Sequence, residues 1–271
     1  MKRSTLELLC CPSCQTELTF RDESRSTSGD EGELFCSHCE RSYIIKNGIV
    51  HFVDLQELEG LNRRFARFYN RWSRLETVFD RLSFLPMGGE RKARTEILRR
   101  LELNNGRVLE VSIGSGGNLP YLFESPNVGD VYGLDISVTQ LTNCRKLVAN
   151  RQWPVDLFLG KAEELPFKSD SFDSVFHIGG INFFSDKKKA IDEMIRVARP
   201  GTRMLIADES EQVARNVARF LRLPRSSQGN VVDTSVPLHL VPETMKEIHV
   251  DGIWKMHGQY HGYCLEFRKP G

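Results

Sequence analysis

A glycine-rich segment followed by an acid has the residue types and the spacing of a nucleoside site. Residues 107–117, RVLEVSIGSGG, place an apolar run before Gly114 and Gly116, and residues 131–135, VYGLD, form a second apolar run that ends on Asp135. Glycine allows a sharp turn and lets the backbone approach a ligand without a Cβ in the way. Asp135 lies 19 residues beyond Gly116, where a carboxylate can accept ribose hydroxyls. The pattern therefore predicts a bound nucleoside.

Four cysteines near the beginning of the chain have the spacing of metal ligands. Cys11 and Cys14 form one C-x-x-C pair, Cys36 and Cys39 form a second, and 21 residues separate the two pairs. Each pair makes a tight turn that directs two sulfurs at one point, and two such turns complete a tetrahedral site. Few apolar residues surround the cysteines, so that a metal is expected to stabilise this part of the fold. We predict a structural zinc ribbon.

Two disulfides are the alternative for these four cysteines. No segment resembles a signal peptide, because the apolar run Leu6–Cys11 is short and contains Glu7. A reducing cytosol would keep the thiols free, which favours zinc. Cys10 adjoins Cys11 and cannot direct its sulfur at the same point, and His38 lies inside the second turn. Both are therefore expected to lie outside the ligand set.

The glycine segment resembles motif I of the class I S-adenosylmethionine (SAM) methyltransferases, usually written E/D-x-G-x-G-x-G. Here the motif begins at Glu110 and carries Ser112 in place of its first glycine. Two later segments also resemble this family: GKAEELPFKSDSFDSVFHIGGINFF at 160–184 and DEMIRVARPGTRMLIAD at 192–208. The motifs follow in the order that is typical of the family, and the resemblance covers roughly residues 61–271. They are similar to those of methyltransferases of ubiquinone and menaquinone biosynthesis.

This resemblance implies a SAM site built from the glycine segment and the strands that follow it. Glu110 would lie near the methionine moiety and Asp135 on the ribose, with Ala162 and Glu163 beside the adenine. The expected cofactor-binding residues are Glu110, Ser112, Gly114, Gly116, Asp135, Ile136, Ala162, Glu163 and His177. SAM has no phosphate, and the chain accordingly lacks a phosphate-binding Gly-Lys-Ser/Thr sequence.

The cysteine-containing segment resembles a second family. From LLCCPSC to CSHCERSYIIKNGIVHFV, it is similar to the small zinc ribbons that activate tRNA methyltransferases, and to the zinc module of an rRNA guanine methyltransferase family. The resemblance implies one zinc ion held by Cys11, Cys14, Cys36 and Cys39. A zinc site with four protein ligands has no open coordination position, so that its role is structural. A protein partner that docks on the ribbon is a further expectation.

These motifs require an α/β framework to position them. The resemblance implies a Rossmann-like sheet that is mostly parallel, with an antiparallel last strand. We expect a zinc-ribbon domain at 1–54, a helical connector or cap at 55–105 and a SAM-binding methyltransferase domain at 106–271. Residues 246–255 and 260–269 alternate in hydropathy like two antiparallel strands. Residues 209–242 are an insertion that is expected to act as a lid over the substrate side.

The connector has apolar residues at helical spacing and arginines between them. Aromatic helices at this position in related methyltransferases lie over the SAM pocket, so that Phe65, Tyr69 and Phe84 are expected to shape the substrate cavity. The arginines are Arg63, Arg64, Arg67, Arg71, Arg74 and Arg81. We interpret these arginines as the solvated face of a helix. A local basic surface for nucleic acid or an acidic lipid is the alternative.

Methyl transfer is a displacement at a carbon that the sulfonium already activates, so that the protein must chiefly orient the reactants and exclude water. A base is needed only for an acidic or hydroxyl nucleophile. His177 and Asn182 follow the fourth strand of the fold and are the candidate catalytic residues, with a packed histidine as the alternative for His177. Enzymes that methylate exocyclic base amines carry Asp/Asn-Pro-Pro-Tyr/Phe here, and this chain does not. Oxygen, carbon, sulfur and ring-nitrogen acceptors remain open.

Three functions fit these features. The favoured one is methyl transfer from SAM to a small-molecule or lipid-like acceptor. An RNA methyltransferase that holds RNA with the ribbon and the arginine helix is the first alternative. Residues 1–54, however, carry 6 basic against 9 acidic residues, whereas phosphate binding needs clustered positive charge. A non-catalytic SAM-binding partner protein is the second alternative.

The composition of the chain limits the kinds of partner and the location that we expect. The 271 residues include 37 basic and 36 acidic ones, so that the overall charge does not require a polyanionic partner. No apolar run approaches membrane-spanning length. We expect a cytoplasmic protein whose partner is a small-molecule acceptor, with nucleic acid as the less favoured partner.

Overall fold

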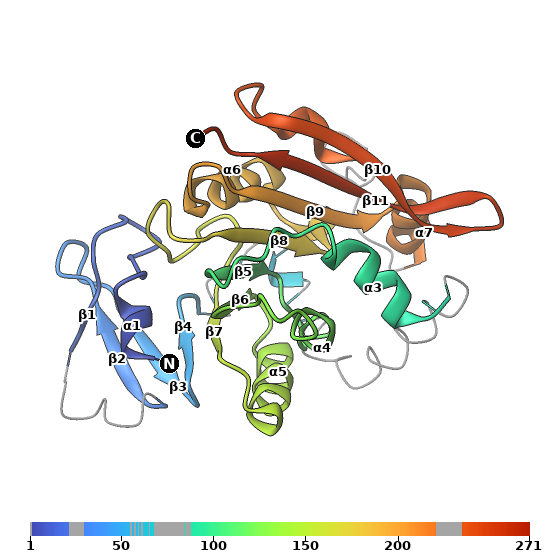
Figure 1. Cartoon of the computed structure of the whole chain (residues 1–271). Helices are drawn as coiled ribbons and strands as arrows, with labels where there is room; N and C mark the ends of the chain where they lie inside the picture. Colours follow the sequence, from blue (N-terminus) through green and yellow to red (C-terminus); the bar gives the residue numbers. More distant parts are fainter. Residues whose placement is uncertain are drawn as a thin grey trace.

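One sheet of 11 strands connects the beginning of the chain to its end (Figure 1). The computed structural model describes residues 2–21, 30–54, 56, 58, 60, 62–64, 66–67, 84, 88–220 and 235–271. In chain order the strands are β1 (Thr19–Phe20), β2 (Gly32–Phe35), β3 (Ser42–Lys46), β4 (Ile49–His51), β5 (Val108–Val111), β6 (Val131–Asp135), β7 (Val155–Leu159), β8 (Ser174–Ile178), β9 (Arg203–Glu209), β10 (Lys246–Met256) and β11 (Gln259–Arg268). The helices are α1 (Arg3–Leu6), α3 (Glu90–Leu98), α4 (Leu119–Leu122), α5 (Val138–Arg151), α6 (Lys187–Val197) and α7 (Glu211–Phe220), with 3-10 turns η3 (Ile181–Phe183) and η4 (Pro237–Leu240).

The centre of the sheet is parallel and its end near the C-terminus is antiparallel. The strand order is β1-β2-β3-β4-β7-β6-β5-β8-β9-β11-β10. Strands β7, β6, β5, β8 and β9 pair in parallel, while β11 runs antiparallel to β9 and to β10. This confirms the predicted Rossmann-like sheet. The chain moves outward from β5 through β6 to β7, and in the opposite direction from β8 to β9, so that the order reverses between β5 and β8. Open α/β sheets bind ligands at such a reversal, beyond the carboxyl ends of the strands.

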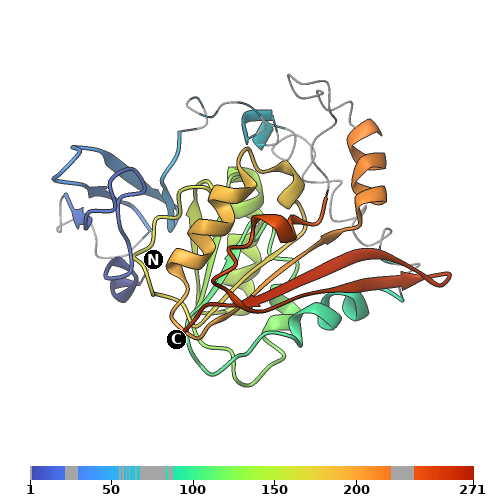
Figure 2. The same ribbon diagram turned by 90° about the horizontal axis from the view of Figure 1, so that it is seen from above.

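Helices cover both faces of the central strands, which explains why those strands are buried throughout. Every residue of β5 and β6 is buried. Leu109 packs in the cluster that contains Met194 of α6, whereas Val108 packs in the cluster that contains Ile97 of α3 and Cys144 of α5. Neighbouring residues of a strand point to opposite faces, so that the two clusters are the two halves of the core. Figure 2 shows α6 and α3 on opposite sides of the sheet.

The N-terminal segment extends the sheet of the rest of the chain. Strand β4 pairs in parallel with β7, with Val50 opposite Phe158. An isolated bridge joins Leu9 to Phe167, and the Phe52 amide donates to the Leu159 carbonyl at 2.8 Å. The sequence divided the chain at residue 54, but the sheet continues across that boundary. The cause is the pairing of strands more than 100 residues apart, which sequence periodicity does not report.

Several predicted elements fall partly outside the described part of the chain. Phe65, Tyr69, Arg71, Arg74 and Arg81 lie there, as does the middle of the predicted lid. Of the described connector arginines, Arg63, Arg64 and Arg67 are exposed, as a solvated helix face requires. The described parts of the insertion are α7 and η4. None of the helices within the described ranges is long and apolar enough to cross a membrane.

Candidate functional site

A cavity of about 240 Å³ lies where the strand order reverses, beyond the carboxyl ends of β5, β6 and β8. Most of the predicted cofactor-binding residues line it: Glu110, Ser112, Gly114, Asp135, Ile136, Ala162 and Glu163. Gly116 and His177 belong to the same elements but do not line the cavity. Four separate loops therefore converge on one volume, as the order of the motifs predicted.

The two central glycines of the loop have different roles. Both adopt positive φ, 57° at Gly114 and 83° at Gly116, a region that side chains with a Cβ rarely occupy. A Cβ built on Gly114 would meet nothing within 4 Å, so that this position leaves space open to a ligand. A Cβ on Gly116 would lie 2.9 Å from the Cys144 sulfur of α5. Gly116 therefore serves the packing of the loop on the helix. Ser112 has a φ of 62°, which explains why the family pattern places a glycine there.

Asp135 connects the end of β6 to the glycine loop. Its Oδ2 accepts from the Gly114 amide and its Oδ1 from the Ser137 amide, each at 2.8 Å. Burial raises the pKa of Asp135 to about 6, although these backbone bonds act in the opposite direction. Each carboxylate oxygen can accept more than one hydrogen bond. The side chain is thus fixed in place and still able to accept ligand hydroxyls.

Glu110 carries an unpaired oxygen at the cavity wall. Its side chain is 1% exposed, and Oε1 accepts from the Asn118 side-chain amide at 2.6 Å. No polar group within hydrogen-bonding distance reaches Oε2 in the described structure. Burial raises the pKa of Glu110 to about 8. Buried polar atoms are nearly always paired, so that an exception beside a cavity points to a ligand group that completes it.

Glu163 connects separate segments of the chain through hydrogen bonds, which its predicted position beside adenine did not suggest. Its Oε1 accepts from the Ser185 and Asp186 amides at 2.9 and 3.3 Å, and from the Asn62 side chain at 3.2 Å. The carboxylate therefore joins the loop after β7 to the beginning of α6 and to the connector. Ala162, its neighbour, leaves the cavity unobstructed because its side chain is small.

Several further side chains line the cavity and were not predicted, among them Arg94 of α3, Asn118 of the glycine loop and Trp254 of β10. Trp254 adopts a φ of 55°, and its indole donates to the Ala93 carbonyl at 3.2 Å. Phe84, which was expected to shape the substrate cavity, does line it and packs edge-on against Trp254 at 5.7 Å between ring centroids. No local pattern marks Trp254, because its position depends on the twist of the final hairpin.

The two predicted catalytic residues lie behind the cavity wall. His177 is fully buried, its Nδ1 is 2.9 Å from the Val111 carbonyl, and its ring packs against Phe184. Burial lowers the pKa of His177 below its ordinary value. Because a carbonyl oxygen can only accept, Nδ1 is the donor in this hydrogen bond. Asn182 is also buried; its amide nitrogen lies 3.5 Å from Asp208, and its oxygen accepts from Lys187. Neither side chain lines the cavity. His177 is packed in the core, although its Nε2 has no hydrogen-bond partner among the described residues, so that its catalytic role stays a prediction.

Asp208 fixes the loop after β8, which forms part of the cavity wall. It is fully buried at the end of β9 and accepts from the amides of Gly180, Ile181 and Glu209 at 3.1, 2.9 and 2.9 Å. Gly179 and Gly180 of this loop line the cavity. A carboxylate that accepts several backbone N–H bonds is strongly held. This wall is therefore preorganised by β9.

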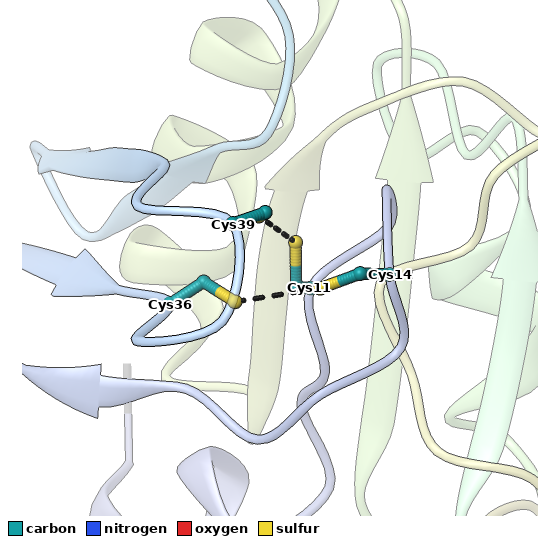
Figure 3. A group of neighbouring side chains, drawn as sticks. All are labelled: Cys11, Cys14, Cys36 and Cys39. Atoms are coloured by element: carbon teal, nitrogen blue, oxygen red, sulfur yellow. Dashed lines mark hydrogen bonds between the residues drawn. The ribbon is translucent and has the colours of Figure 1, made fainter.

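The four predicted metal ligands form one compact cluster. The sulfurs of Cys11, Cys14, Cys36 and Cys39 all lie within 4.8 Å of one another. Figure 3 shows two turns that face each other, with sulfur separations of 3.5 Å for Cys11–Cys39 and 3.4 Å for Cys14–Cys36. A tetrahedral zinc–thiolate site has bonds of about 2.3 Å and hence sulfurs about 3.8 Å apart. The cluster fits zinc, and buried Cys10 and exposed His38 contribute nothing to it.

Comparisons with protein families agree with both halves of this arrangement. Residues 109–206 match the family described as methyltransferase domain, and residues 2–48 match the family described as Trm112p-like protein. The first match covers the strands and loops around the cavity. The second covers the cysteine cluster.

Curated relatives are similar over part of the chain. The chain is 34% identical over 110 residues to the phthiotriol/phenolphthiotriol dimycocerosates methyltransferase of Mycobacterium leprae, which is 40% of each chain. It is 29% identical over 161 residues to the demethylmenaquinone methyltransferase of Lactiplantibacillus plantarum, covering 58% of this chain and 64% of that one. The chain thus spans about two fifths of the length of the former relative.

Solved structures share the fold. A SAM-dependent methyltransferase from Aquifex aeolicus superposes with a TM-score of 0.54 at 19% identity, covering 72% of this chain and 97% of that one. A chain from the complex of the Haloferax volcanii Trm112 methyltransferase activator gives 0.56 at 16% identity, covering 75% and 98%. At this identity the likeness concerns the sheet and its helices.

Proposed function

We propose that this chain, which joins a class I SAM-dependent methyltransferase domain to an N-terminal Trm112p-like domain, transfers a methyl group from SAM to a small-molecule or lipid-like acceptor. The observation that carries the proposal is the cavity at the reversal of the strand order. It brings the unpaired oxygen of Glu110, the fixed carboxylate of Asp135 and the open position at Gly114 to one volume.

The cavity residues suit a nucleoside with an amino-acid tail. Asp135 would accept the ribose hydroxyls, and Ile136 and Ala162 would contact the adenine. Glu110 would accept from the ammonium of the methionine moiety, and Ser112 and Gly114 would contact the same end of the cofactor. When bound, SAM supplies a methyl group on a sulfonium, which is already an activated leaving group.

The apolar and aromatic part of the cavity lining would receive the acceptor. Phe84, Phe184, Ile178 and Trp254 form it, together with the glycines of the loop after β8. Such walls orient an apolar acceptor and exclude water from the displacement. The relatives named for a lipid and for a quinone precursor support an acceptor of this kind. The protein's part in the reaction is therefore chiefly to position the two reactants.

The four-cysteine cluster would hold one zinc ion. All four ligands come from the protein, so that no coordination position stays open for a reacting group. The metal would stabilise the N-terminal turns and take no part in methyl transfer. A protein partner that docks on this domain is a further proposal, supported by its match to the Trm112p-like family.

Transfer of labelled methyl groups tests the proposed function. The zinc-loaded protein is incubated with methyl-tritiated SAM and, separately, with demethylmenaquinol, a bacterial lipid extract and total tRNA. We expect label in an organic-extractable product, and much less of it, at a SAM concentration that is limiting for the wild type, when Asp135→Ala replaces the wild type. Label in tRNA would contradict the acceptor class and favour an RNA methyltransferase. SAM binding without transfer to any of the three would favour a non-catalytic SAM-binding protein.

A further inference from the structure

A fourth carboxylate lines the cavity at the end of β9. Besides Glu110, Asp135 and Glu163, the lining includes Glu209, the last residue of that strand. The first two acids face the proposed cofactor, and Glu163 joins separate segments of the chain through its hydrogen bonds. Glu209 is half-buried and has no part in the cofactor contacts proposed above. Its position therefore calls for a different role.

The alternation of side chains along β9 separates Glu209 from its neighbour Asp208. Ile206 packs in the core cluster on the α6 side of the sheet, whereas Ala207 packs in the cluster that contains Trp254 on the α3 side. Every second residue of a strand points to the same face, so that Glu209 shares the face of Ala207. Asp208 is thus directed at the loop after β8, and Glu209 is directed at the α3 side of the sheet.

The pairing of β9 with β11 brings Glu209 beside an aromatic side chain. Gly262 of β11 lies directly opposite Glu209, and a Cβ built on Gly262 would overlap the six-membered ring of Trp254. Side chains of directly opposite residues lie side by side on one face of a sheet. The Glu209 carboxylate and the Trp254 ring are therefore neighbours in the cavity lining, and Phe84 packs edge-on against the same ring.

The order of the strands places Glu209 away from the groups proposed for the cofactor. Asp135 ends β6 and Glu110 lies in β5, whereas β9 is two strands beyond β5 in the opposite direction. The pairings of β5 with β8 and of β8 with β9 place Glu110 and Leu205 at the same level of the sheet. Glu209 lies four residues beyond Leu205, which is roughly 13 Å farther toward the carboxyl ends of the strands. An acceptor that approaches the cofactor from the side of β8 and β9 would meet this carboxylate.

A carboxylate beside aromatic walls suits an acceptor that is planar and must lose a proton. A base is needed when the nucleophile is a hydroxyl group, and the rings of Phe84 and Trp254 offer flat apolar surface to an aromatic acceptor. An ammonium acceptor would bring a second positive charge beside the sulfonium, which like-charge repulsion disfavours. The Phe84 ring also already packs against the Arg94 guanidinium, with Cζ 5.1 Å from the ring centroid.

We propose that Glu209 is the general base of methyl transfer and that the acceptor presents a phenolic or enolic hydroxyl to it. The inference rests on the proposed function and deepens it by naming the acceptor class. Glu209 takes the hydroxyl proton, and the electron pair of the O–H bond stays with the acceptor. The acceptor oxygen then bonds to the methyl carbon, or the adjacent ring carbon does so and its hydrogen moves to the oxygen. The carbon–sulfur bond breaks with its electron pair left on sulfur.

Glu209→Gln tests this role because it keeps the size of the side chain and removes the base. Transfer of methyl tritium to demethylmenaquinol and to the bacterial lipid extract is measured at saturating SAM, and calorimetry measures SAM affinity. General base catalysis contributes about 10²- to 10⁴-fold, so that we expect transfer to fall by at least this lower factor while SAM affinity is unchanged. Mass spectrometry of the wild-type product should find the methyl group on a phenolic or enolic oxygen or on the adjacent carbon.

Two further variants make the test specific. Glu209→Ala should be equally slow and should recover part of its rate when acetate is added, because acetate can replace the missing carboxylate. Glu211→Gln is the control, since Glu211 is an exposed acid in the first turn of α7 that pairs with Arg215. It should transfer methyl groups like the wild type.

An unchanged rate in Glu209→Gln would overturn the proposal, as would a loss of SAM affinity as large as the loss of rate. A slow Glu209→Ala that acetate does not accelerate would assign Glu209 a structural role and overturn it as well. A wild-type product with the methyl group on nitrogen or sulfur would also overturn it, even if the variants fail to fold. A wild type that binds SAM and methylates nothing would contradict the proposed function itself, and the role of Glu209 with it.

Discussion

The cofactor cavity and the cysteine cluster are both formed by short turns at strand ends, but they differ in how their polar groups are satisfied. In the cluster four sulfurs lie within 4.8 Å of one another, which is a complete set of ligands for a tetrahedral ion. In the cavity Glu110 keeps an unpaired oxygen, and Gly114 faces open space. A closed set of ligands suits an ion that stays bound. An incomplete set suits a molecule that must enter and leave.

The two regions are also connected through the backbone. The Cys10 amide donates to the Pro166 carbonyl at 3.0 Å, and the Lys168 amide donates to the Leu8 carbonyl at 2.8 Å. The same loop begins with Ala162 and Glu163, which line the cavity. These backbone bonds connect the cysteine turn to one wall of the cofactor cavity. Loss of the metal from the cysteine cluster should therefore also disturb this cavity wall.

Removal of the metal is the largest perturbation we expect. Binding of structural zinc is worth about 10–16 kcal/mol in small zinc domains, so that chelation should unfold the turns and strands β1–β3. Hydrogen exchange should rise across residues 9–46 and, less strongly, across 160–168. Elemental analysis should find about one zinc per chain in the untreated protein.

The adjacent cysteine provides the control for this experiment. Cys36→Ser should reproduce the effect of chelation, whereas Cys10→Ser should retain the metal, because Cys10 lies outside the cluster. Unchanged exchange after complete loss of zinc, or a protein that contains oxidised cysteines and no metal, would contradict the closed-site account.

Substitution of Asp135 is expected to act on the open site. Asp135→Ala removes the acceptor proposed for the ribose hydroxyls and should lower SAM affinity by about 10- to 100-fold. Asp192→Asn is the control, since Asp192 is an exposed residue of α6 that pairs with Lys188. Calorimetric titration compares the variants. Equal affinity in Asp135→Ala and the wild type would remove Asp135 from the site.

Substitutions of the two loop glycines should distinguish an effect on packing from an effect on ligand binding. Gly116→Ala places a Cβ against the Cys144 sulfur and should destabilise the protein by about 2 kcal/mol through overpacking. Gly114→Ala meets no atom within 4 Å. Its main effect should be on SAM affinity, beyond the strain that both variants share at positive φ. Denaturant unfolding and SAM titration of the pair measure the two effects, and equal losses of stability would refute the distinction.

A smaller effect is expected in the pH dependence of stability. A buried acid whose pKa is raised stabilises the fold fully below its unfolded pKa, 4.5 for Glu110, and loses that contribution as the pH rises through about 8. The cofactor-free protein should therefore become less stable between pH 6 and 9. Glu110→Gln should remove this slope and gain about 1 kcal/mol over the wild type at pH 9. Urea unfolding of the wild type and of Glu110→Gln at pH 6 and at pH 9 measures this effect. If both proteins lose the same stability between the two pH values, Glu110 is not the cause.

The sequence predicted the parts of the molecule that depend on local spacing. The cysteine pairs and the glycine loop are specified within a few residues, and the structure brings each set together as expected. The pairing of β4 with β7 was not predictable, because it joins Val50 to Phe158 and neither residue has a feature that marks its partner. Arg94 was missed for the same reason, since its place in the cavity lining depends on how α3 packs against Gly117 of the glycine loop.

His177 shows the limit of assigning chemistry from residue type. Its place at the end of a central strand suggested a catalytic group, yet strand alternation turns its ring into the core against Phe184. Phe84 and Trp254, which lie far apart in the sequence, line the cavity instead. The sequence does not report the direction of the His177 side chain, because that direction depends on how the strands and helices pack against one another.

Calorimetric titration of the zinc-loaded protein with SAM and, separately, with NAD tests the central claim most directly. Glu110, Asp135 and the glycine loop suit a nucleoside with an amino-acid tail, and the two acidic side chains in the cavity lining disfavour the anionic pyrophosphate of NAD. The account predicts SAM binding with a dissociation constant on the order of micromolar, about −8 kcal/mol, and no binding of NAD. Binding of NAD, or the absence of SAM binding by a folded, zinc-loaded protein, would contradict it.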